Sequence, residues 1–126
     1  MTVNEALQRV SVLRPAHGYG AEILIGWLRE LELTVFDEVI NTHENPEGIV
    51  YHDIESIADG GVTLAVGAPY DRIYVDRLLY MIDQNNLESA REAATAARFA
   101  ASYEEFCAAY NRSHMPLQKA KFNYMA

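Results

Sequence analysis

Apolar residues recur at steps of three and four along most of this chain, which is the spacing of one face of an α-helix. The clearest stretch runs from about Ala21 to Thr42. Its apolar positions are Leu24, Trp27, Leu28, Leu31, Val35 and Val39. The pattern predicts a helix there, with this stripe facing a core.

The preceding stretch predicts a shorter helix. Thr2 and Glu5 have the spacing of a capping box, in which each side chain accepts a hydrogen bond from the other residue's exposed backbone N–H. Pro15 disfavours helix at the residue before it, and two glycines follow. We therefore expect this helix to end at about Leu13.

Two more helices are predicted in the second half. Pro69 fits the first position of a helix, where its missing N–H costs no hydrogen bond. That helix should reach about Gln84, with Tyr74, Leu78, Met81 and Ile82 on its apolar face. The last helix should run from about Leu87 to Asn111. Because seven of its residues from 90 to 101 are alanines, which permit close approach of a neighbour, we expect this helix to be central.

The stretch between Glu44 and Ala68 lacks the helical pattern. Proline and glycine punctuate two short β-leaning runs at 49–51 and 62–66, which predicts a projecting loop with at most a small hairpin. The fold class is therefore mainly α, a small bundle of about four helices with a long loop or short hairpin. Its predicted core consists of Trp27, Leu28, Leu31, Tyr74, Leu78, Phe99, Phe106 and Tyr110.

Charge separates the body from the C-terminal end. The 126 residues carry a net charge of −8, but residues 1–111 hold seven basic and eighteen acidic side chains, whereas residues 112–126 hold three basic and no acidic ones. Pro116 also ends the helical pattern. We predict a helical domain over residues 1–112 and an extended arm over 113–126. An acidic body argues against tight binding of duplex DNA, which requires clustered cations.

The chain offers little catalytic chemistry. Its histidines, His17, His43, His52 and His114, have no metal-ligand spacing. His43-Glu44 and His52-Asp53 are adjacent pairs, and we interpret them as solvated loop residues rather than acid–base pairs. Cys107 is expected to be a buried, unreactive thiol. We expect no enzyme, metal or cofactor. We also expect no membrane segment, because no 18-residue apolar stretch occurs, and synthesis in the cytoplasm.

Three blocks of the sequence resemble the head-tail connector (head-completion adaptor) proteins of tailed bacteriophages. Residues 25–44 are similar to that family's RWLSELDGxIYxEVIxTHE. Residues 64–71 are similar to LLVPxPYD, with a following YxxYLxxxID pattern. Residues 110–116, Tyr-Asn-Arg-Ser-His-Met-Pro, are similar to YNRTHMP. The blocks occur in register over about residues 4 to 124. Gly26 stands where the family usually has arginine.

The resemblance implies a ring, commonly of twelve copies, that docks under the portal protein in the virion neck after genome packaging. A tail-side neck or stopper protein would then attach, and DNA would pass through the lumen without specific binding. The portal-binding arm would comprise His114, Met115, Pro116, Leu117, Lys119, Lys121, Phe122 and Tyr124. A loop contacting a neighbouring subunit or the tail would comprise Asn45, Pro46, Ile49, Tyr51, Val62 and Leu64.

Two other classes of protein are alternatives to a connector. The acidic composition fits a phage-encoded inhibitor or DNA mimic that binds a host nucleic-acid-binding protein. A small helical enzyme would need a nucleophile, a metal set or a cofactor fingerprint, and none is visible in the sequence. Ring formation with a portal would separate the connector from both.

Overall fold

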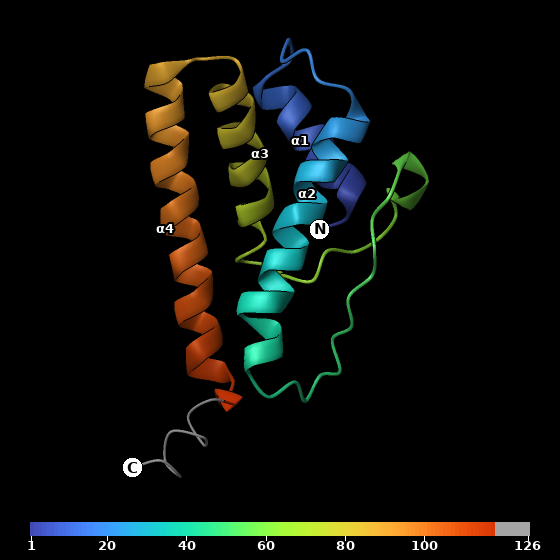
Figure 1. Ribbon diagram of the computed structural model, residues 1–126, viewed down its shortest axis with the longest axis vertical. Coiled ribbons are helices and arrows are strands. Elements are labelled where there is room, and N and C mark those ends of the chain that lie inside the picture. Colours follow the sequence, from blue (N-terminus) through green and yellow to red (C-terminus); the bar gives the residue numbers. More distant parts are fainter. Residues whose placement is uncertain (118–126) are drawn as a thin grey trace.

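The computed structural model describes residues 1–117 of the chain. Its four helices are α1 (Val3–Leu13), α2 (Ala21–Glu38), α3 (Arg72–Asn85) and α4 (Ser89–Ser113). Two short 3-10 helices, η1 (Ile40–Thr42) and η2 (Ile57–Asp59), lie between α2 and α3. In Figure 1, α4 and α3 lie side by side, α2 follows with α1 behind it, and the long connection runs along the side of α2 away from α4. The predicted mainly helical fold is confirmed.

The first two helices form where the pattern predicts them. At the start of α1, the Thr2 hydroxyl accepts from the Glu5 N–H at 3.2 Å, and the Glu5 carboxylate accepts from the Thr2 N–H at 3.1 Å, so the capping box is present. Helix α2 is shorter than expected. It ends at Glu38, and the chain tightens into η1 because the backbone departs from helical geometry at Val39.

The predicted start of the third helix is wrong. Pro69 lies in a turn before α3 rather than at its first position, and the Ala68–Pro69 peptide bond is cis. The Tyr70 N–H donates to the Gly67 carbonyl at 3.0 Å and so closes that turn. Regular helix begins only after Asp71.

The alanine-rich helix is not central. Helix α4 packs along α3 at the outer edge of the bundle (Figure 1). Its buried residues are Thr95, Ser102, Phe106 and Tyr110, whereas most alanines of the 90–101 stretch are exposed. Alanine favours helix in any environment because it loses no side-chain entropy, so its abundance does not identify the buried face.

Six of the eight predicted core residues are buried: Leu28, Leu31, Tyr74, Leu78, Phe106 and Tyr110. Trp27 and Phe99 are only half-buried and pack against the margin of the core. The Trp27 ring meets the Tyr19 ring edge-on at 5.3 Å, and the Arg77 guanidinium lies 5.2 Å from the Phe99 ring centre. Both aromatic rings lie at the edges of their helical stripes, where one side of each ring remains open to solvent.

The long connection does not project as expected. Residues 44–67 lie against the bundle and bury Ile54, Leu64 and Val66 in the core. Within residues 1–117 no strand or hairpin forms, and the only β-type pairings are isolated bridges between Thr2 and Thr63 and between His43 and Pro116. The two β-leaning runs therefore supply apolar anchors rather than a sheet.

Candidate functional site

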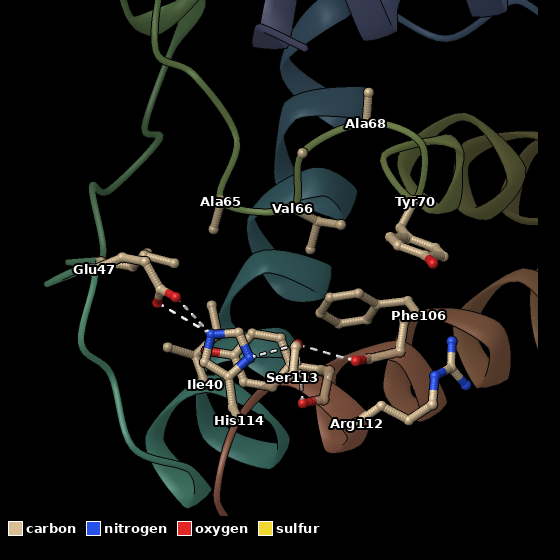
Figure 2. Close-up of a pocket in the computed structure, with 14 residues that line it drawn as sticks. Ile40, Glu47, Ala65, Val66, Ala68, Tyr70, Phe106, Arg112, Ser113 and His114 are labelled. Carbon is tan, nitrogen blue, oxygen red and sulfur yellow. Dashed lines mark hydrogen bonds and ion pairs between the residues drawn. The ribbon is translucent and has the colours of Figure 1, made fainter.

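A groove of about 470 Å³ opens at the lower end of the bundle, where four separate parts of the chain meet. These parts are the end of α2 with η1, the first part of the long connection, residues 65–70 and the last two turns of α4. Figure 2 shows the groove, with an apolar floor and a polar rim. Its main apolar side chains are Ile40, Ile49, Val66, Tyr70, Phe106 and Tyr110.

One wall of the groove is fixed by a buried carboxylate on α2. Glu32 is almost fully buried and accepts hydrogen bonds from the Ala65 N–H at 2.8 Å and the Tyr74 hydroxyl at 2.6 Å. The same hydroxyl accepts from the Val66 N–H at 2.9 Å. Burial raises the pKa of Glu32 more than these hydrogen bonds lower it. The network ties residues 65 and 66 to both α2 and α3.

The opposite side is built around two rings at the end of α4. His114 stacks on Tyr110 with 3.8 Å between ring centroids and 4° between ring planes. Its Nε2 lies 2.8 Å from a carboxylate oxygen of Glu47, and Ser113 contacts its Nδ1 at 2.8 Å (Figure 2). The hydrogen bond from His114 lowers the pKa of Glu47. These contacts join α4 to the start of the long connection.

A second histidine supports Tyr110 from behind. His43 is buried, and its ring meets the Tyr110 ring edge-on at 5.0 Å. Its Nδ1 lies 2.6 Å from the Val39 carbonyl oxygen, and its Nε2 lies 2.6 Å from the Asn111 side chain. Both ring nitrogens are therefore occupied within the protein, and this histidine orients α4 on η1 rather than facing solvent.

The beginning of the predicted arm is attached to the body. The Glu44 N–H donates to the Met115 carbonyl at 2.8 Å, and His43 forms a bridge with Pro116. His114 and Pro116 are half-buried, whereas Met115 and Leu117 are 57% and 47% exposed. The expectation that the arm leaves the bundle at residue 113 or 114 is therefore wrong. Four further arm residues lie outside the described residues: Lys119, Lys121, Phe122 and Tyr124.

The predicted contact loop divides into exposed and buried positions. Asn45 and Pro46 are exposed, and Ile49, Tyr51 and Val62 are half-buried against the body. Leu64 is 2% exposed, so it belongs to the core and is not available to a partner in this fold. Its side chain packs in the core, next to Ala65, whose N–H donates to the buried Glu32 carboxylate.

Sequence reasoning missed the groove because its walls come from distant segments. Ile40 and Tyr70 are 30 residues apart in the sequence, and no local pattern shows that their side chains line the same groove. The available signal was the resemblance itself. The first block ends at Thr42-His43-Glu44, the second contains residues 65–70 and the third contains residues 110–114. All three blocks converge at this end of the bundle.

No group of three or more His, Cys, Asp or Glu side chains in residues 1–117 is arranged to hold a metal ion. No helix there is long and apolar enough to cross a membrane. Cys107 is half-buried rather than fully buried, and burial raises the pKa of its thiol, which disfavours the reactive thiolate.

Comparisons of the chain with protein-family models, curated proteins and solved structures found no match.

Proposed function

We propose that this chain is a head-tail connector of a tailed bacteriophage. Copies would form a ring beneath the portal, help close the filled head and provide the surface to which the tail attaches. The observation that carries the proposal is the meeting of three separate sequence blocks, each resembling connector proteins, around one groove. When segments far apart in the sequence resemble one family and also line one surface, a binding role for that surface is consistent with both observations.

The shape of the lower end supports a role in docking. The groove is apolar at its floor, and the exposed side chains of Met115 and Leu117 lie on the segment that leaves its rim. Clustered apolar surface of this kind, edged by polar residues, is typical of protein–protein contact sites. The exposed residues Asn45 and Pro46 belong to the connection that forms the same end.

The charge distribution also supports the proposal. Residues 1–111 carry eleven more acidic than basic side chains, and residues 112–126 carry three basic side chains. An acidic body lining a channel would repel DNA phosphates and let the genome pass. A basic segment would be drawn to acidic groups on another protein, mainly by faster association.

The structure changes where the portal-binding arm would begin. Because His114 and Pro116 are held against the body, the proposal assigns the portal-binding arm mainly to the residues after Leu117. Under this proposal the portal contacts come from Lys119, Lys121, Phe122 and Tyr124, together with the exposed Met115 and Leu117.

Electron microscopy of this chain mixed with the portal protein of the same phage tests the proposal. The connector account predicts rings of this protein stacked on one face of the portal ring. A substitution at the lower end, Ile49→Asp, should abolish stacking, whereas Ile23→Asp at the other end of α2 should not. A portal that binds no copies of the wild-type chain would refute the connector function. Tight binding of a DNA-binding protein by a monomer would favour the inhibitor instead.

A further inference from the structure

The groove lies beside the point where the described part of the chain ends. Arg112, Ser113 and His114 line the groove, and Leu117 is only three residues further along. Residues 118–126 contain Phe122, an aromatic side chain without polar atoms. We propose that in the free protein this groove is the docking site for the chain's own C-terminal segment, with Phe122 as the anchor.

The distances allow this return. Five extended residues from Leu117 to Phe122 span up to about 17 Å. Along α4, the eight residues from His114 back to Phe106 rise only about 12 Å. Because His114 itself lines the groove, a segment that runs back along the last turns of α4 is long enough to reach it.

The surface of the groove suits an aromatic side chain. Phe106, Tyr110 and Tyr70 place three rings around it, and the branched side chains of Ile40 and Val66 complete the floor. Figure 2 shows Phe106 and Val66 facing each other at its centre. Aromatic rings favour edge-on or offset contacts with one another, and such contacts add to the gain from burial.

Charge contributes less than apolar contact. The carboxylate of Glu47 stands on the rim, and the exposed Glu44 precedes it by three residues, so Lys119 and Lys121 meet acidic side chains on approach. Arg112 also lines the groove and opposes them. The apolar anchor therefore determines whether the segment docks, and the lysines mainly affect its approach.

Tethering favours the chain's own segment over that of a second copy. A short flexible tether gives an effective concentration in the millimolar range. A weak contact with a dissociation constant of about 1 mM would then be roughly half occupied within one chain. The same contact between separate chains at about 10 μM would be occupied at only about 1%.

The docking itself requires no partner, so this inference does not rest on the proposed function.

Methyl NMR of the full chain tests the docking. Phe122→Ala should shift the methyl signals of Ile40, Ile49 and Val66, because a docked aromatic ring perturbs nearby methyl groups. The adjacent substitution Asn123→Ala should leave them in place. Neither variant should move the methyl signals of Ile23, about 25 Å away along α2. The chemical-shift differences between the methyl signals of wild type and Phe122→Ala should stay the same on tenfold dilution.

Two results would overturn the inference. Unmoved groove signals in Phe122→Ala would show that the segment does not enter the groove. A difference between wild type and Phe122→Ala that fades on dilution would make a second copy the occupant. Portal binding is measured separately, so a chain that docks its own segment but binds no portal would refute the connector function and leave this inference standing.

Discussion

The two ends of the bundle are held together by different chemistry. At the upper end, Asp83 on α3 is 1% exposed and pairs with the Arg14 guanidinium through two hydrogen bonds of 3.0 Å, while Thr95 on α4 donates to it at 3.1 Å. At the lower end, stacked rings and the single carboxylate of Glu32 hold the chain around an open groove.

The difference has a physical meaning. A buried ion pair fixes three helices in one arrangement, because separating its partners leaves a charge without solvent or counter-ion. The lower end depends on contacts of roughly 1 kcal/mol each, such as ring stacking and hydrogen bonds. We therefore expect the end that carries the groove to open more easily than the end around Asp83.

The largest expected effect is at the upper end. Asp83→Ala removes both hydrogen bonds to the partly exposed Arg14 guanidinium and the acceptor of the Thr95 hydroxyl, and should lower the free energy of unfolding by about 3 kcal/mol. Urea denaturation followed by circular dichroism measures it. The control is Glu105→Ala, which breaks the exposed pair between Arg72 and Glu105 and should cost less than about 1 kcal/mol. Equal costs in the two variants would contradict the special role of the buried pair.

Tyr74→Phe is expected to have an intermediate effect. It removes one hydroxyl and leaves the Val66 N–H and one oxygen of Glu32 without that partner, so unfolding should become easier by about 1 to 3 kcal/mol. Hydrogen exchange should accelerate at residues 65 and 66 more than at the end near Asp83. A uniform increase over the whole chain would show that the two ends open together.

His114→Ala should have a smaller effect. The substitution removes a ring stacked on Tyr110 and a hydrogen bond to the exposed Glu47, which together should cost about 1 kcal/mol. The Tyr110 NMR signals report the loss of stacking directly. His17→Ala, which removes a histidine at the upper end, should leave those signals unchanged.

The two buried carboxylates should respond to pH in opposite directions. Burial raises the pKa of Asp83. The hydrogen bond from Arg14 and its positive charge lower the pKa by more than burial raises it, so the net shift is downward. Its contribution to stability is present above the ordinary carboxyl pKa and is lost as pH falls through the lower folded value. The pKa of Glu32 is raised, so its contribution is present below the ordinary value and is lost as pH rises through the folded one.

Two isosteric variants isolate these contributions. The cost of Asp83→Asn should shrink below about pH 3.8, because the wild type then loses the same stabilisation. The cost of Glu32→Gln should instead shrink as pH rises above about 4.5. Urea titrations at several pH values measure both. Parallel trends would show that the two ends do not differ in this respect.

The helices were predictable because their signals are local. The capping box at Thr2 and the apolar stripe through Leu28 and Leu31 act within a few residues, and both predictions are confirmed. The position of α4 was not predictable from its alanines. Which face of a helix is buried depends on its partner, and the face toward α3 was marked by Thr95, Ser102 and Phe106 instead.

The groove required tertiary information. Leu64 was expected at a contact surface because it lies in a glycine-rich stretch, but it is buried beside the hydrogen bonds that Glu32 makes to residue 65 and to Tyr74. A lone glutamate on an apolar helix face gives no indication of which backbone N–H group it will accept from. The attachment of His114 to Glu47, 67 residues away, is likewise invisible in local patterns.

Hydrogen–deuterium exchange of the chain, alone and bound to the portal protein, tests the central claim most directly. The account predicts new protection on portal binding at residues 65–70 and 110–117, with little change around Arg14 and Asp83. Protection confined to the Arg14 end, or no change in a mixture with saturating portal, would contradict the assignment of the lower end as the connector's docking surface.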